Sequence, residues 1–164
     1  MKPAVALFML LLSACGLGGS RSTGPATPIT PATPVGVVEA AKGVLEQYKQ
    51  AYEVRSAEAL GAIYAHTLDV SLVHQGEAQQ GWTAVENYLR DRLVRAAEVR
   101  VKVTDVAIAS LGDRGAVVTA SMRQDINDGT STVSEQGFLT LALRLEPGAN
   151  GDHWVIASEH FSFR

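Results

Sequence analysis

The sequence predicts an α+β domain: a curved antiparallel sheet wrapped around N-terminal helices, which together form a cone-shaped α+β barrel. Two observations carry this prediction. Between residues 37 and 93, apolar residues mostly recur every three or four positions, as they do on one face of an α-helix. From residue 99 onwards they alternate, as they do in strands with one buried face. Helices followed by a run of strands are typical of α+β folds, because the helices can then cover one face of the sheet.

The helical part of the domain begins after the last proline of the N-terminal region. Apolar residues at helical spacing predict a first helix over residues 37–52. Ser56 is placed to cap a second helix over residues 57–64, because its hydroxyl can accept a hydrogen bond from the first turn. Alternating, β-branched residues predict a strand over 68–73, and Gly81 precedes a third helix. One face of this third helix carries Trp82, Val85, Leu89 and Leu93.

The second half of the domain is predicted to be a meander of long antiparallel strands. Over residues 99–108 the apolar phase slips between Val103 and Val106, which indicates a β-bulge near Thr104 and Asp105. The later strands are separated by turns at residues 111–115, 127–129 and 146–152, and the last two are predicted over 133–145 and 153–163. A strongly bent sheet covered by few helices tends to leave a conical cavity between the two layers.

The N-terminal region predicts a lipoprotein. One cation, Lys2, precedes an apolar run that is too short to cross a bilayer and has the size of a secretory h-region. The Leu-Ser-Ala-Cys sequence that ends at Cys15 resembles the bacterial lipobox, whose cysteine is lipidated and becomes the mature N-terminus. The resemblance implies that residues 1–14 are a lipoprotein signal peptide and that Cys15 anchors the protein to a membrane. An ordinary secretory peptide cleaved nearby is the alternative.

Residues 15–34 are predicted to be the lipidated cysteine and a tether rich in Pro, Gly, Ser and Thr. Four prolines at every third position are typical of an extended, polyproline-like linker. They are Pro25, Pro28, Pro31 and Pro34. Gly16 follows the cysteine, where an aspartate often signals retention in the inner membrane. The resemblance therefore implies a location in the bacterial cell envelope, on the outer membrane facing the periplasm, with the folded domain at residues 35–164.

Composition excludes several classes of site. A net charge of −3 gives no basic surface for a nucleic acid. Cys15 is the single cysteine, so a lipidated chain keeps no thiol for a disulfide, a nucleophile or a soft metal site. The four histidines are dispersed without the short spacing of metal ligands. We therefore expect no metal, no cofactor and no nucleic-acid partner.

The order of elements and several short motifs resemble the nuclear-transport-factor-2-like (NTF2-like) superfamily, with SnoaL-like and ketosteroid-isomerase-like members most similar. The matching motifs are Tyr64-Ala65, Gly81, Trp154-x-Ile156 and His160-x-Ser162. The resemblance covers residues 37–164 and implies a cone-shaped domain. Because this fold hosts isomerases, dehydratases, cyclases, assembly domains and simple binders, the resemblance alone chooses no activity.

The candidate site consists of side chains expected to face the cone. Simple alternation places His160 on the same face as Ile156 in the last strand, and His74 on the same face as Leu72. Burial of Glu135 would raise the pKa of its carboxyl and make it the best candidate for a general base. Purely structural histidines and an exposed Glu135 are the alternatives. The expected ligand-binding residues are Tyr48, Tyr52, Tyr64, His74, Trp82, Met122, Gln124, Glu135 and His160.

The function expected from these observations is a cell-envelope lipoprotein whose cone binds a small, largely apolar molecule without catalysis. One alternative is an isomerase or cyclase that uses His160, His74 or Glu135 as acid or base. A second is a protein-interaction module whose cone is filled by its own side chains. We also expect a homodimer through the convex face of the sheet, where Phe138 and Ala142 would form an apolar centre.

Overall fold

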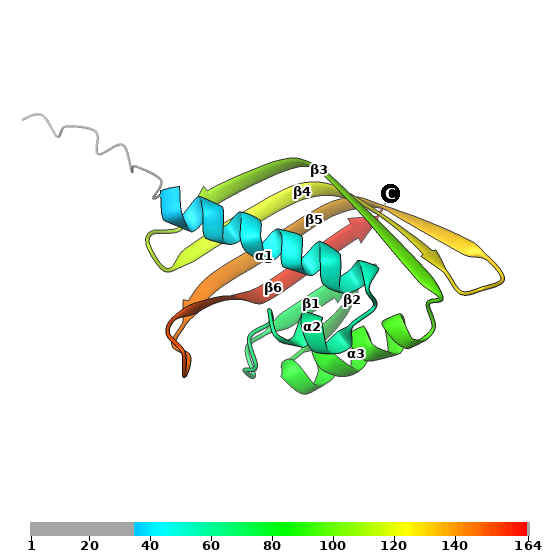
Figure 1. Ribbon diagram of the computed structural model, residues 1–164, viewed down its shortest axis with the longest axis horizontal. Coiled ribbons are helices and arrows are strands. Elements are labelled where there is room, and N and C mark those ends of the chain that lie inside the picture. Colours follow the sequence, from blue (N-terminus) through cyan, green and yellow to red (C-terminus); the bar gives the residue numbers. More distant parts are fainter. Residues whose placement is uncertain (1–34, 164) are drawn as a thin grey trace, which may run out of the picture. The chain divides into compact units, whose positions relative to one another are not determined.

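The computed structural model describes residues 35–163, which form helices on one face of a six-stranded sheet (Figure 1). The helices are α1 (Val35–Glu53), α2 (Ala57–Gly61) and α3 (Trp82–Val94). The strands are β1 (Ser71–His74), β2 (Glu77–Gln80), β3 (Glu98–Ser110), β4 (Gly115–Asn127), β5 (Thr132–Glu146) and β6 (His153–Phe163). The predicted signal peptide, the lipidated Cys15 and the tether lie outside the described residues. No helix within 35–163 has both the length and the apolar character needed to cross a membrane.

The sheet has the strand order β2-β1-β6-β5-β4-β3. All neighbouring strands are antiparallel except β1 and β6, which are parallel. The sheet curves around α1 without closing, because β2 and β3 remain as edges (Figure 1). Helix α1 packs against β3, β4 and β6, whereas α3 packs against β1 and β2. The predicted α+β class, with a curved antiparallel sheet around the helices, is confirmed.

Helix α1 buries the apolar stripe from which it was predicted. This stripe consists of Val37, Ala41, Val44, Leu45, Tyr48, Ala51 and Tyr52. Its residues recur every three or four positions and therefore lie on one face of the helix. The burial of this face against the concave side of the sheet forms most of one wall of the core.

Helix α2 begins where the sequence predicts, because Ser56 Oγ accepts a hydrogen bond from the backbone nitrogen of Ala59 at 3.0 Å. It ends at Gly61, before the predicted end at residue 64. The residues that follow pair with β6 instead. The nitrogen of Ile156 donates to the Ile63 carbonyl at 2.8 Å, and the nitrogen of Ala65 donates to the Ile156 carbonyl at 3.0 Å. These bonds fix the segment after α2 on the sheet.

Strand β1 begins at Ser71, later than the predicted start at residue 68. Arg144 of β5 donates to Asp69 at 2.6 Å and to the Thr67 hydroxyl at 2.9 Å. The segment before β1 is therefore held by a side chain of β5, and Leu68 within it is 92% exposed. This ion pair between distant segments has no local signal in the sequence.

Two β-bulges shape the long strands, and one of them was predicted. In β3 the register shifts between Thr104 and Ala107, and Asp105 has a positive φ of 54°, as the slipped apolar phase indicated. In β6 the register also shifts, because Ser158 pairs with Ala142 while Ile156 pairs with Leu143. Ala157 is thus an extra residue that sequence analysis missed.

The bulge at Ala157 reverses the faces of the last part of β6. A one-residue slip sends every later side chain to the opposite side of a sheet. Glu159 and Phe161 are therefore buried, whereas His160 is exposed. The expectation that His160 faces the cone is wrong for this reason.

Phe138 lies on the same outer face, 49% exposed, and the homodimer expected there stays a prediction.

Candidate functional site

The inner part of the cone is filled by the domain's own side chains. Tyr48, Tyr52, Tyr64 and Met122 are each at most 3% exposed and belong to the hydrophobic core. They were expected to line an open cavity, but the structure packs them against one another and against the sheet. Tyr48 and Tyr52, for example, have ring centroids 4.8 Å apart. This expectation failed because periodicity shows that a side chain faces inwards but not how much space remains there.

Glu159 lies at the centre of this packed region and is 1% exposed. The Tyr48 hydroxyl donates a hydrogen bond to Glu159 Oε1 at 2.8 Å, and the Tyr64 hydroxyl donates to Oε2. Burial raises the pKa of the Glu159 carboxyl, and the two tyrosine hydrogen bonds only partly oppose this effect. Burial, followed by the neighbouring carboxylate charge, also raises the pKa of both tyrosines. Glu159 thus stays uncharged to a higher pH than an exposed glutamate.

A second polar cluster lies between α3 and the sheet. Arg92 donates through Nη2 to Glu135 and, at 3.0 Å, to Gln124 Oε1. Glu135 and Gln124 are register partners on β5 and β4, so their side chains are neighbours on one face. His74 Nδ1 is hydrogen-bonded to the Tyr88 hydroxyl, and His74 Nε2 lies 3.7 Å from Glu135 Oε2. Tyr88 and Arg92 reach the cluster together because they are four residues apart on α3.

The pKa of Glu135 is shifted in the direction opposite to the one expected. Burial alone would raise the pKa of this carboxyl. His74 and the Arg92 guanidinium lower it by a larger amount, so the pKa falls below its ordinary value. The prediction of a raised pKa omitted Arg92, which is 43 residues away in the sequence. Glu135 is therefore a stable anion that is paired with a cation, and a weak general base.

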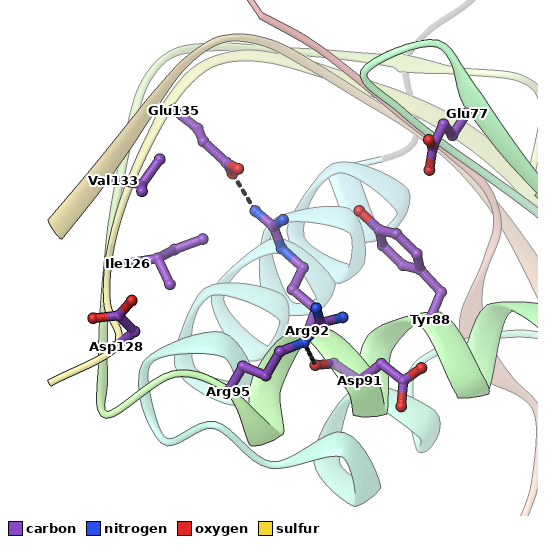
Figure 2. Close-up of a pocket in the computed structure, with 9 residues that line it drawn as sticks. All are labelled: Glu77, Tyr88, Asp91, Arg92, Arg95, Ile126, Asp128, Val133 and Glu135. Carbon is purple, nitrogen blue, oxygen red and sulfur yellow. Dashed lines mark hydrogen bonds and ion pairs between the residues drawn. The ribbon is translucent and has the colours of Figure 1, made fainter. Parts of the chain in front are cut away.

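A pocket of about 440 Å³ opens beside this cluster, and we call it the α3 pocket (Figure 2). It is lined by Glu77, Tyr88, Asp91, Arg92, Arg95, Ile126, Asp128, Val133 and Glu135. Figure 2 shows Arg92 reaching from α3 towards Glu135, with Tyr88 on one side and Ile126 and Val133 on the other. Of the predicted site residues, Glu135 lines this pocket, and His74 and Gln124 contact its lining residues from behind.

Two other predicted site residues lie elsewhere. Trp82 stacks on His66, with ring centroids 4.2 Å apart and an angle of 13° between the ring planes. Both rings line a separate surface pocket with Gly61 and Arg90, so Trp82 forms no wall of the α3 pocket. His160 pairs with Thr140 on the outer face of the sheet. Among residues 35–163, no group of three or more His, Cys, Asp or Glu side chains could hold a metal ion.

The sequence reasoning missed Glu159, Arg92 and Tyr88. Tyr88 and Arg92 follow Val85 by three and seven positions, which places both beside the apolar face of α3, so helical spacing could have found them. Glu159 follows the bulge in β6. Phe161 was the available signal, because a buried aromatic residue two positions later puts Glu159 on the interior face.

Comparison with known proteins places this geometry in a family. A family model described as a SnoaL-like domain matches residues 41–164. A proposed dehydratase of the NTF2-like family from Streptomyces avermitilis is 23% identical, with a TM-score of 0.70 over 80% of this chain and 99% of that protein. A proposed scytalone dehydratase from Novosphingobium aromaticivorans is 12% identical, with a TM-score of 0.69 over 80% and 87% of the two chains.

An NTF2-like superfamily protein from Salmonella enterica is 16% identical, with a TM-score of 0.69 over 78% of this chain and 91% of that protein. No curated protein matches the sequence. At these identities the likeness to the solved structures shows the fold alone and says nothing about activity. The family match, in contrast, spans nearly all of the described domain. The chain therefore belongs to the SnoaL-like domain family and has the fold of the NTF2-like superfamily.

Proposed function

We propose that the domain binds a small, largely apolar molecule with one polar end in the α3 pocket, without a chemical step. The observation that carries this proposal is the pocket itself, whose volume of about 440 Å³ is within the range of small-molecule sites. Ile126, Val133 and the ring of Tyr88 give it apolar surface. The partly buried Arg92–Glu135 pair gives it one fixed polar wall. Such a division of the lining is typical of binding sites that orient an amphipathic ligand.

The state of the carboxyl groups supports binding rather than catalysis. A general base needs a pKa near the working pH, and His74 and Arg92 together hold the pKa of Glu135 below its ordinary value. The other buried carboxyl, Glu159, has a raised pKa but is enclosed by Tyr48 and Tyr64 in the packed part of the cone. Neither group combines a suitable pKa with access to the pocket.

Filling the α3 pocket with a larger side chain is expected to abolish ligand retention. Val133 lines the pocket and is 57% exposed, so Val133→Trp can place its indole ring in the pocket without entering the core. Native mass spectrometry of the full chain purified from its own membrane should show a bound small molecule on the wild type and none on the variant. Val106→Trp is the matched control, because Val106 is a 45% exposed strand valine outside the pocket. Equal retention by all three proteins would contradict the proposal.

A second candidate function is acid–base catalysis by His74. It is favoured by one observation: Tyr88 binds Nδ1, while Nε2 faces Glu135 at 3.7 Å. A histidine held at one nitrogen is oriented for proton transfer through the other. Two of the solved structures with a similar fold are proposed dehydratases. Incubation of the released molecule with fresh protein, followed by NMR of the molecule, separates the candidates. A catalyst changes its bonds, with loss of water in a dehydration and with no change of mass in an isomerisation, whereas a binder returns it unchanged.

We further propose that the protein is a cell-envelope lipoprotein anchored through Cys15, a residue outside the described range. The Leu-Ser-Ala-Cys motif and the absence of any other cysteine support this. Intact-mass analysis of the mature wild type is expected to show an N-terminal Cys15 with added acyl chains. Cys15→Ser should remove this mass and leave the protein either soluble or as an unprocessed precursor. A mature chain that begins at another residue and carries no lipid would overturn the proposal.

A further inference from the structure

The inner wall of the α3 pocket has more hydrogen-bond donors than acceptors. Glu135 is an acceptor there, and it already accepts from Arg92 Nη2. Within residues 35–163, Arg92 makes its side-chain hydrogen bonds through Nη2 alone, which leaves the N–H groups of Nη1 and Nε for a ligand. Arg92 lines the pocket and is partly accessible from it (Figure 2). The guanidinium therefore presents donors to whatever enters.

Two more donors lie directly behind this wall. Gln124 turns its oxygen towards Arg92, and its amide nitrogen is buried without a partner among the described residues. His74 Nε2 is also buried without a hydrogen bond there. A proton on Nε2 suits its surroundings, because a lone pair at that position would face the Glu135 carboxylate at 3.7 Å. His74 Nδ1 then accepts from the Tyr88 hydroxyl. The cluster thus lacks acceptors and not donors.

The charges around the pocket select the kind of acceptor. Arg92 and Glu135 neutralise each other at the inner wall. At the rim three acidic side chains, Glu77, Asp91 and Asp128, stand against one cation, Arg95. A ligand carboxylate would meet the repulsion of Glu135 and of this rim. The same rim would attract an ammonium group, but at the inner wall this group would meet a cation, Arg92, and a carboxylate that is already paired. An uncharged oxygen meets neither obstacle.

We propose that the polar end of the ligand is an uncharged carbonyl oxygen, which accepts hydrogen bonds from Nη1 or Nε of Arg92. The apolar remainder of the ligand packs on Ile126 and Val133. This inference rests on the proposed binding function and names its ligand class: a neutral ketone, ester or amide with an apolar body. Gln124 is a positioning residue in this arrangement, because its oxygen orients the guanidinium.

Four fragments of nearly equal size test the ligand class: 1-indanone, indane, 1-aminoindane and indane-1-carboxylate. Each is titrated into the wild type while the methyl signals of Ile126 and Val133 are followed by NMR, which reports binding in this pocket. We expect 1-indanone to bind roughly tenfold more tightly than indane, the difference expected for one hydrogen bond to a charged donor. The amine and the carboxylate should bind more weakly than the ketone. Tightest binding of either charged fragment would overturn the inference.

Variants identify the donor. Arg92→Met combined with Glu135→Gln removes the guanidinium without leaving a buried charge, and it should bind 1-indanone and indane equally. Arg90→Met is the matched control, because Arg90 lies on the same helix outside this pocket, and it should keep the preference for the ketone. If the double variant does not fold, the wild-type titrations decide alone. Equal affinity of the wild type for all four fragments refutes the carbonyl inference but supports a binding pocket. If no fragment binds and Val133→Trp retains the native molecule, the proposed function itself fails.

Discussion

Glu159→Leu is expected to lower the free energy of unfolding by about 2–4 kcal/mol, because it leaves two buried hydroxyls, those of Tyr48 and Tyr64, without their acceptor. Each stranded polar group costs about 1–3 kcal/mol, and the removal of a buried carboxyl offsets part of this loss. Urea unfolding at fixed pH measures the change. Glu159→Gln is the control, since its amide can accept from one tyrosine and donate to the other. A leucine variant as stable as the wild type would show that the tyrosines find other partners.

The same glutamine variant tests the pKa shift of Glu159. The folded-state pKa of this carboxyl is raised by burial, whereas the unfolded chain has the ordinary value. Its contribution to stability is therefore complete below the unfolded pKa and is lost as the pH rises through the folded pKa. Unfolding free energies measured from pH 4 to 8 should fall for the wild type relative to Glu159→Gln. Glu135, whose pKa shifts in the opposite direction, is present in both proteins and cancels in the difference. Parallel curves would mean that the pKa of Glu159 is ordinary.

Gly137→Ala is expected to destabilise the domain by about 3 kcal/mol or more, because the added methyl group overlaps the backbone of β6. A Cβ at Gly137 would lie 2.6 Å from the carbonyl carbon of Ser162 and 2.9 Å from the Cα of Phe163, and it would overlap the Ser162 oxygen. Backbone atoms of a paired strand cannot move aside as a flexible side chain can. Thermal and urea unfolding measure the loss.

Gly43→Ala is the matched control for this substitution. Gly43 lies within α1, and a Cβ there meets nothing within 4 Å. Because alanine has the higher helix propensity, this variant should be more stable than the wild type by about 0.5–1 kcal/mol. If Gly137→Ala unfolds at the same urea concentration as the wild type, β5 and β6 must be able to separate at this point without loss.

The sequence predicted those parts of the fold that leave a local pattern. The stripe from Val37 to Tyr52 gave α1, and the slipped apolar phase after Val103 gave the bulge in β3. The bulge in β6 was missed because Ile156 is followed by the small Ala157 and then by three polar residues, so little apolar phase remained to reveal the slip. Simple alternation along this strand therefore placed His160 on the inner face, which Glu159 occupies in the structure.

The candidate site was predicted less well because its geometry depends on contacts between distant residues. His74, Gln124 and Glu135 lie on the inner face, where alternation along their strands places them. Whether Glu135 meets a cation depends on whether the Arg92 side chain of α3 reaches β5, and no spacing in the sequence records this contact. The filled cone likewise reflects the summed volumes of side chains from several elements, a property that single-strand patterns do not contain.

The position of β6 in the sheet has a consequence for the order in which the domain can fold. β6 is the last strand in chain order, yet it lies between β1 and β5 and joins the β1–β2 pair to the β5–β4–β3 meander. While a ribosome is still producing the first 150 residues, β1 and β5 both lack β6, the strand that lies between them. The segment that follows α2 also lacks its partner, Ile156. Such long-range pairing makes folding slow compared with that of helical proteins of similar size. The nascent domain therefore stays open until its synthesis is nearly complete, and it then closes around a single strand.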